Sequence, residues 1–266
     1  IEADILDHTL ISAAMEGVDM VFHLAAITAL WTADESHYQT VNVEGTHAVL
    51  HAAIAAGVRR FVHCSSFVTT ISGPRRARPV DENTMPAIEA LFGAYARSKK
   101  RAEMLVMNEG YRIEPVIVLP SAPLGAGDYN MTAPSAFLRD LVNGKIPATI
   151  NQMTNFIDVE ILADAMVHVG EYSDPGERYL LTGKNRPMRE FLDLVAKITG
   201  LAMPQYQVPY PLAAMIAFCE EAMLCRVTKR PPKASYAGVR MAGCPLEFDN
   251  AKAMGAFDIN LTPIED

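Results

Sequence analysis

The sequence predicts a doubly wound α/β fold, in which helices cover both faces of a parallel β-sheet. Short apolar runs alternate with segments of helical spacing over the first 120 residues, which is the pattern of strand–helix–strand units. Half of the 266 residues are apolar, and this is enough for a substantial core. Small or hydroxyl residues end two of the apolar runs, at the strand ends where open α/β sheets keep their ligand crevice.

The first elements alternate in this way. We interpret Asp4–Asp7 as the end of a strand that enters a loosely helical segment, which stops near Gly17. Residues 19–26 form an apolar run ending in small residues, which would let a flat ligand approach the backbone. Ordinary core packing explains the same residues, and the two interpretations are compatible. Residues 35–56 have helical spacing and carry Asn42 as a lone polar residue, which faces either the active site or solvent.

The next elements bring hydroxyl groups to a strand end. The run Phe61–Ser66 predicts a buried strand with serine at its carboxyl end. A long loop rich in Pro, Gly and Arg continues to Pro86, which is typical of the border of an active site. One helix is predicted over 88–108, followed by a buried strand over 112–119.

The character of the sequence changes after the strand over 112–119. Beyond a loop from Pro120 to Asp128, short strands are predicted over 156–159 and 179–182, helices over 133–143, 161–171, 188–198 and 209–225, and then a tail of short turns without a closing helix. We therefore expect one domain over 1–120 and a smaller, mainly substrate-binding domain over 121–266, with some elements returning to the first.

Three residues in this framework could carry out acid–base chemistry on a substrate oxygen: Ser66, Tyr95 and Lys99. Tyr95 and Lys99 are four residues apart in a predicted helix and so share a face. A free phenol has a pKa near 10, and an ammonium one helical turn away is expected to lower it. Tyr95 could then exchange a proton with the oxygen while a hydride moves at the adjoining carbon. Ser66 could hold the same oxygen in place.

Each of these signals also has an ordinary explanation. With nine tyrosines in the chain, a Tyr-x-x-x-Lys spacing arises readily by chance. A Ser-Ser pair after a strand is often just a turn. The order of the three residues, and their positions after a strand and within a helix, favour the catalytic interpretation.

Charge and composition argue against several other classes. The formal net charge of −8 disfavours nucleic acid as the main partner. The four cysteines have no C-x-x-C spacing and the seven histidines no H-E-x-x-H pattern, so we expect no metal. Scattered cysteines and the absence of a signal-peptide pattern at residues 1–4 fit a cytoplasmic protein. Membrane binding is not expected, because no apolar run is of spanning length and the segment 209–225 has few basic residues.

Nearly the whole chain resembles the extended short-chain dehydrogenase/reductase superfamily, also called the NAD-dependent epimerase/dehydratase family. The motifs that carry the resemblance are Asp4-Ile5, Val21–Ala26, Val41–Thr46, Ser65-Ser66, Tyr95–Lys99 and Pro120–Asp128. Within the family the chain looks most similar to the dihydroflavonol-reductase-like branch and its hopanoid-associated sugar epimerase group. That looser match rests on Leu30-Trp31, residues 142–148 and residues 176–179.

The resemblance implies an NAD(P)-binding Rossmann domain over 1–120 and a catalytic trio of Ser66, Tyr95 and Lys99, with Lys99 also holding the nicotinamide ribose. It also makes Asn42 an active-site neighbour. The cofactor contacts that it implies are Asp4, Ile5, Leu24, Ala25, Ala26, Thr28, Ser65, Tyr95, Lys99, Pro120 and Ser121.

Three features depart from the family pattern. Leu119 stands where the family often has Arg, and Ile161 stands where an Asp often caps a helix, unless Asp158 or Glu160 takes that role. The Gly-rich phosphate-binding fingerprint is absent, since the family places it further upstream. We therefore expect strand–helix units of roughly 50 to 60 residues before the sequence given. Without them the apolar strand over 19–24 would have an unpaired edge.

The leading functional hypothesis is an NAD(P)-dependent oxidoreductase that transfers hydride between nicotinamide and a carbonyl or secondary alcohol, with Tyr95 as acid or base. The alternatives are a nucleotide-sugar epimerase or dehydratase without net redox, and a non-catalytic NAD(P)-binding sensor. The Met- and Ala-rich segment 209–225 suits an apolar substrate at least as well as a nucleotide sugar, although ordinary core packing is the favoured explanation of these residues. The branch resemblance mildly favours NADP over NAD, and homodimers are common in the superfamily.

Overall fold

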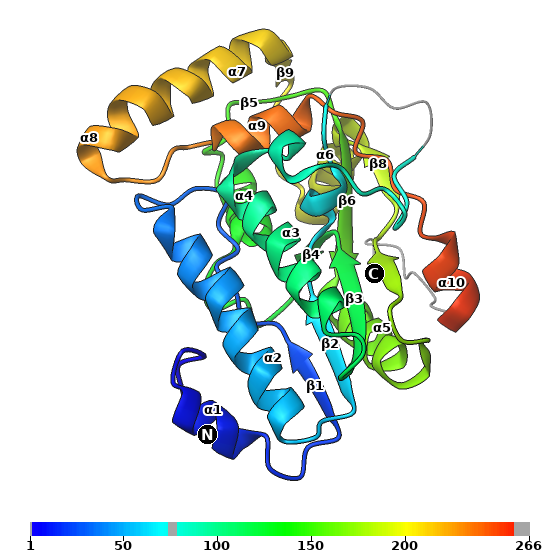
Figure 1. Ribbon diagram of the computed structural model, residues 1–266. Coiled ribbons are helices and arrows are strands. Elements are labelled where there is room, and N and C mark those ends of the chain that lie inside the picture. Colours follow the sequence, from blue (N-terminus) through cyan, green and yellow to red (C-terminus); the bar gives the residue numbers. More distant parts are fainter. Residues whose placement is uncertain (1, 74–78, 258–266) are drawn as a thin grey trace.

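The computed structural model describes residues 2–73 and 79–257, and its centre is a four-stranded parallel sheet (Figure 1). The order of the strands is β1-β2-β3-β7. Their bounds are Met20–His23 for β1, Arg60–Cys64 for β2, Glu114–Pro120 for β3 and Arg178–Leu181 for β7. The predicted α/β fold with a parallel sheet is confirmed.

The two central strands are buried on both faces, which explains why their sequences are apolar without alternation. Along β2, Phe61 belongs to the core on one face and Val62 to the core on the other, and both are fully buried. In β3, Pro115 pairs with Phe61 near the strand start, where a missing N–H is tolerated.

Helices cover both faces of this sheet (Figure 1). On the first face lie α1 (His8–Ala14), α2 (Thr46–Ala55) and α3 (Gly93–Asn108), and on the second lie α5 (Val159–Tyr172) and α10 (Ala251–Phe257). The helix of α2 begins with π-type turns over Tyr38–Gly45, so that the predicted helix over 35–56 is confirmed to within three residues.

β1 lies at the edge of the sheet and pairs with β2 alone among the strands described. Phe22 and Leu24, in and just after this strand, are 38% and 56% exposed. The further units expected upstream stay a prediction.

The rest of the chain forms a second, smaller part. One small sheet joins β4 (Ala122–Leu124), β6 (Met153–Asp158) and β8 (Asn185–Pro187), and a second joins β5 (Ala148–Thr149) to β9 (Tyr206–Gln207). The helices of this part are α4 (Ala133–Val142), α6 (Met188–Thr199), α7 (Tyr210–Cys219), α8 (Arg226–Thr228) and α9 (Tyr236–Ala242). Its core is a separate cluster around Leu141, Phe191 and Leu192.

Two predictions at the ends of the chain are wrong. Residues Asp4–Asp7 form a turn and not the end of a strand, because the Asp4 carboxylate accepts the Leu6 N–H at 2.9 Å and Asp7 caps α1. The tail contains α9 and α10, whereas only turns were expected.

Two helix starts also differ from expectation. The helix predicted over 88–108 begins at Gly93, whose φ of +82° interrupts it after a single 3₁₀ turn over Ile88–Ala90. At α5, Asp158 accepts the N–H groups of Glu160 and Ile161, so it provides the cap that Ile161 could not.

Candidate active site

Ser66, Tyr95 and Lys99 come together at the carboxyl end of β2. The Ser66 hydroxyl lies close enough to the Tyr95 phenol to lower its pKa, and the Lys99 ammonium donates to the carbonyl oxygen of Cys64 at 2.6 Å. All three residues are at most 8% exposed. Ser66 is fixed where it caps the 3₁₀ turn over Phe67–Thr70, and Tyr95 and Lys99 are one turn apart on α3.

The pKa of Tyr95 lies well above its ordinary value of 10, chiefly because the phenol is buried. The nearby Ser66 hydroxyl offsets only part of this effect. Among the described residues, Lys99 is not one of the groups that shift this pKa. The prediction that Lys99 lowers the pKa of Tyr95 is therefore wrong for this structure, and Tyr95 is a protonated phenol at neutral pH.

Two buried histidines lie on the strands beneath Lys99. His23 and His63 are paired across β1 and β2, with ring centroids 5.6 Å apart. Burial, together with the charge of Lys99, lowers the pKa of His23 to about 4 and that of His63 well below its ordinary value. Both rings are therefore neutral at pH 7. Of these three side chains, Lys99 is the one that carries a positive charge. Both rings are packed in the core, at 4% and 0% exposure.

Glu103, one turn beyond Lys99 on α3, is a buried residue that sequence reasoning missed. Its carboxylate accepts hydrogen bonds from Ser65 at 2.5 Å and from Thr69 at 2.6 Å. It also accepts from Lys100 and from Arg178 of β7, each at 3.0 Å. Glu103 thus ties the turn that carries Ser66 to α3 and to the sheet. The sequence does place Glu103 four residues after Lys99, and so on the same face of the helix.

Asn42 fixes the loop that follows β1. Its side-chain oxygen accepts the N–H of Ile27 at 2.8 Å, and its amide nitrogen donates to the Ile27 carbonyl and to the Ser98 hydroxyl. The residue is 1% exposed. Of the two readings left open by the sequence, Asn42 therefore faces inward, between α3 and the loop over 24–28.

The residues around the trio fit a nicotinamide dinucleotide. Leu24, Ala25 and Thr28 form an exposed shelf past the end of β1, held against α3 through Asn42. Lys99 uses one of its three N–H donors on the Cys64 carbonyl, and no other acceptor for it is found in the described part of the chain. The shelf and the remaining donors suit the flat middle of a cofactor and its ribose hydroxyls.

The other predicted cofactor residues lie at different distances from the trio. Pro120 ends β3 beside the trio, and Ser121 follows it, 3% exposed, donating its N–H to the Leu181 carbonyl. Asp4 and Ile5 make no recorded contact with the trio: Asp4 is exposed, and Ile5 packs near Gly45. Ser65 is engaged by Glu103, and Ala26 is half-buried within the shelf. Their cofactor contacts stay predictions.

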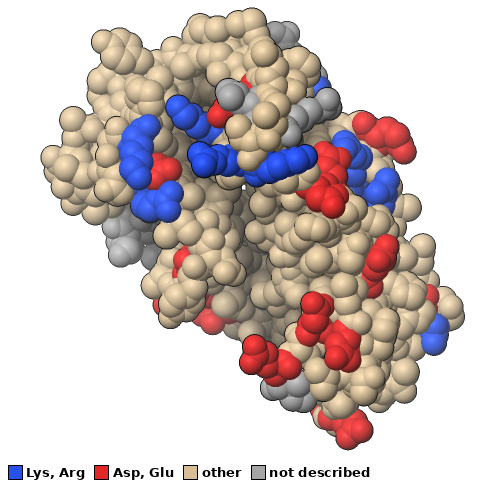
Figure 2. Space-filling model, turned by 90° about the vertical axis from the view of Figure 1, so that its left-hand side faces the viewer, with Lys and Arg blue, Asp and Glu red and all other residues tan. Residues whose placement is uncertain are grey.

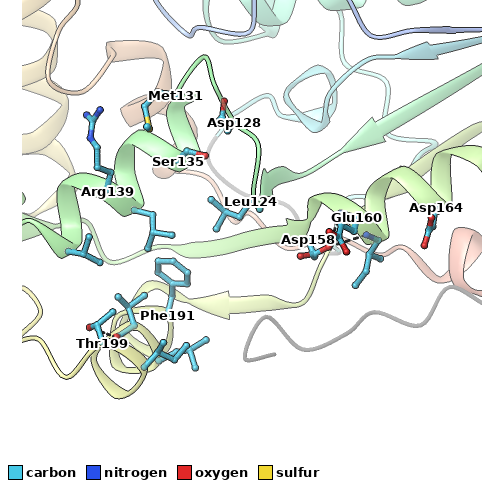
Figure 3. A pocket seen from close by; sticks show the side chains of 17 residues that line it. Leu124, Asp128, Met131, Ser135, Arg139, Asp158, Glu160, Asp164, Phe191 and Thr199 are labelled. Carbon is cyan, nitrogen blue, oxygen red and sulfur yellow. Dashed lines mark hydrogen bonds between the residues drawn. The ribbon is translucent and has the colours of Figure 1, made fainter.

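A cavity of about 920 Å³ lies between α4, α6 and the first turn of α5 (Figure 3). Apolar side chains from α4 and α6, with Phe191 among them, face carboxylates from the loop after β4 and from α5. The carboxylates are Asp128, Asp158, Glu160 and Asp164. No member of the trio lines this cavity, although Leu124 and Gly125 at its rim belong to the loop that begins at Pro120.

No group of three or more His, Cys, Asp or Glu residues in 2–73 and 79–257 could hold a metal ion. Within the same residues, no helix has the length and apolar character needed to cross a membrane.

Comparison with known proteins assigns the class. The model of the NAD dependent epimerase/dehydratase family matches residues 1–181. The chain therefore belongs to this family of enzymes, as the trio, the shelf and the parallel sheet together indicate.

Individual relatives cover nearly all of the chain. It is 30% identical over 245 residues to a putative dihydroflavonol 4-reductase of Synechocystis sp., covering 90% of this chain and 71% of that protein. It is 27% identical over 252 residues to sterol demethylase protein B of Methylococcus capsulatus, covering 94% of this chain and 76% of that protein. The crystal structure of gox2253 superposes with a TM-score of 0.84 at 28% identity, covering 99% of this chain and 80% of that one.

Proposed function

We propose that this protein is an NAD(P)-dependent oxidoreductase that reduces a ketone to a secondary alcohol, or catalyses the reverse reaction. The observation that carries the proposal is the buried trio, in which Ser66 lies beside the protonated phenol of Tyr95 and the Lys99 ammonium has N–H donors left for a ligand. Bound NAD(P)H would supply the hydride that adds to the carbonyl carbon.

The residues of the chain would handle the oxygen and its proton. The Ser66 hydroxyl would hold the carbonyl oxygen, and the Tyr95 phenol would donate its proton to that oxygen as the hydride arrives at the carbon. Lys99 would bind the ribose hydroxyls through its free N–H donors and so place the nicotinamide beside the carbonyl carbon. A proton from solvent would then restore the phenol.

Two further observations support reduction over epimerisation. The raised pKa of Tyr95 keeps the phenol protonated, which is the form needed to donate to a ketone. The 920 Å³ cavity has four carboxylates against the single Arg139, which disfavours a nucleotide diphosphate there. The segment 209–225 no longer supports the reductase, because its apolar side chains are largely exposed to solvent.

The substrate class follows from the relatives. A putative dihydroflavonol 4-reductase and sterol demethylase protein B bear the names of fused-ring compounds, so we infer a fused-ring ketone or alcohol as the substrate. NADP, rather than NAD, remains the preferred cofactor from the branch resemblance. A nucleotide-sugar epimerase and a non-catalytic sensor are the alternatives that the assay must separate.

The test is hydride turnover with NADH and with NADPH against flavanonols, steroid ketones and nucleotide sugars. Net cofactor consumption with an apolar ketone is expected. A sugar product formed without net consumption would identify an epimerase, and cofactor binding without any turnover would identify a sensor. Tyr95→Phe should lower turnover by at least about 100-fold, while Tyr111→Phe, at an 81% exposed position, should leave it unchanged. Full activity of Tyr95→Phe would remove Tyr95 from the mechanism.

A further inference from the structure

The helix at the outer edge of the smaller part has an unusual surface. α7 continues through π-type turns over Glu220–Cys225 into α8, so that residues 210–228 form one helical segment. In Figure 1 this segment lies along the outer edge of the molecule, with the end of α8 away from the large sheet. It contacts the body mainly through α9.

The outward side of this segment is an apolar stripe. Its members are Leu212, Met215, Ile216, Met223 and Val227, which are 44%, 57%, 53%, 67% and 84% exposed. Cys219, also exposed, lies between them. Successive members are one to four residues apart, except for one step of seven from Ile216 to Met223, which contains Cys219. This spacing places the side chains along one face over roughly 22 Å.

Both glutamates of the segment hydrogen-bond backbone groups of the protein instead. Glu220 accepts the backbone N–H of Lys233 at 3.2 Å, and Glu221 accepts that of Tyr236 at the start of α9. Ala217 is 2% exposed, and Phe218 packs edge-on against Tyr236. A surface helix normally shows the opposite arrangement, with its apolar side inward, so the stripe is built to be covered.

The chemistry beside the stripe indicates what covers it. Residues 226–246 contain five Lys or Arg and no Asp or Glu, in a chain of net charge −8. Lys229, Arg230 and Lys233 follow the stripe directly and are exposed. Figure 2 faces the side of the molecule where α8 lies and shows Lys and Arg gathered in its upper half, with Asp and Glu prevailing below.

We propose that residues 210–233 dock this enzyme on an anionic lipid bilayer, with the apolar stripe inserted among the acyl chains and Lys229, Arg230 and Lys233 at the headgroups. Apolar side chains next to a basic group are what an interfacial helix needs. The proposal replaces the expectation of no membrane binding. That expectation rested on the few basic residues within 209–225, and the sequence does not reveal that the apolar side chains of this segment face solvent. It does not depend on the proposed reaction, although an apolar substrate would be collected at such a surface.

The test is flotation of the purified protein with extruded vesicles of phosphatidylcholine, with or without about one third phosphatidylglycerol. The wild type should float with the anionic vesicles. Ile216→Glu/Met223→Glu should bind at least about tenfold more weakly, because two charges replace exposed apolar side chains. Lys229→Gln/Arg230→Gln should lose most of the preference for phosphatidylglycerol and the sensitivity to salt. Met104→Glu is the matched control, a 49% exposed methionine on α3, and should float like the wild type.

Three results would overturn the proposal. These are no flotation of the wild type with either vesicle, equal flotation of the stripe variant and the wild type, and a wild-type dimer in light scattering that Ile216→Glu/Met223→Glu converts to monomer without affecting lipid binding. The last result would assign the stripe to contact between two copies of the chain. Near-UV circular dichroism of each variant confirms that it is folded. A failure of hydride turnover would leave the flotation result standing, so the two proposals are judged separately.

Discussion

Lys99 and Glu103 are one turn apart on α3 and equally buried, yet their surroundings differ in kind. Lys99 makes one hydrogen bond, to the Cys64 carbonyl, and faces two neutral histidines. Glu103 accepts four hydrogen bonds from three different parts of the fold. A buried charge is costly unless it is paired. The charge of Glu103 is fully paired, whereas that of Lys99 has a single hydrogen-bond acceptor among the residues described.

The difference separates structure from function within a single helix. The saturated carboxylate of Glu103 fixes where α3 lies against β7 and the turn after β2. The under-used ammonium of Lys99 has donors left for a ligand, and burial lowers its pKa while Glu103 and Cys64 oppose that shift. Substitutions at Glu103 should therefore act on folding, and substitutions at Lys99 on turnover.

Glu103→Ala should have the largest effect on stability. It leaves Arg178 and Lys100 buried without their carboxylate partner, and breaking such a pair costs about 3 to 5 kcal/mol. Urea unfolding measures this loss. The control is Glu114→Ala, which removes a 36% exposed carboxylate from Arg59 and Arg60 and should cost about 1 kcal/mol or less. Equal losses of stability for the two variants would show that the buried contacts of Glu103 are worth no more than the exposed ion pairs of Glu114.

Lys99→Met should have the opposite profile. Turnover should fall by about 100-fold or more, because the cofactor loses the ammonium that would hold its ribose and place the nicotinamide, and the affinity for NADPH should weaken as well. The free energy of unfolding should change by about 1 kcal/mol at most, since the lost charge is a poorly paired one. Steady-state kinetics, fluorescence titration of NADPH and urea unfolding give the three values. A loss of stability as large as that of Glu103→Ala would show that Lys99 is structural.

Part of this arrangement can be predicted from the sequence because it is local or periodic. The strands at Phe61 and at 114–120 are buried on both faces and therefore appear as unbroken apolar runs. Tyr95 and Lys99 share a helix face by spacing alone. Asn42 was noticed because a lone polar residue stands out in an apolar helix, although its direction could not be known.

What could not be predicted depends on contacts between distant residues. Glu103 looks like an ordinary surface glutamate of a helix, and its partners Ser65 and Arg178 are 38 and 75 residues away. The pKa of Tyr95 was predicted in the wrong direction because spacing reveals the nearby ammonium, whereas burial of the phenol is a property of the whole fold. The outward direction of the α7 stripe is invisible for the same reason.

The histidines beneath Lys99 should make the protein sensitive to acid. The pKa of His23 is about 4 in the fold and 6.5 as its reference value, so between these values the unfolded chain binds more protons. Stability must therefore fall as the pH drops from 6.5 to 4, by about 3 kcal/mol for His23 alone. His63→Leu removes the second ring, which has no hydrogen-bond partner among the described residues, and should reduce this loss. Urea unfolding at several pH values measures it, and an unchanged pH dependence would show that His63 contributes nothing.

Ser65 tests most closely where the structural contacts of Glu103 end and the cofactor site around Lys99 begins. It was predicted to contact the cofactor, but its hydroxyl donates to Glu103 at 2.5 Å and the residue is 4% exposed. If Ser65 belongs with Glu103, Ser65→Ala should cost about 1 to 2 kcal/mol of stability, as expected for a hydrogen bond to a charged group, and should leave NADPH affinity unchanged. Ser66→Ala, one residue on, should instead lower turnover, because the Ser66 hydroxyl lies beside the Tyr95 phenol and would hold the substrate oxygen, while the stability changes less. Weaker NADPH binding by Ser65→Ala would show instead that Ser65 belongs to the cofactor site, as the sequence predicted.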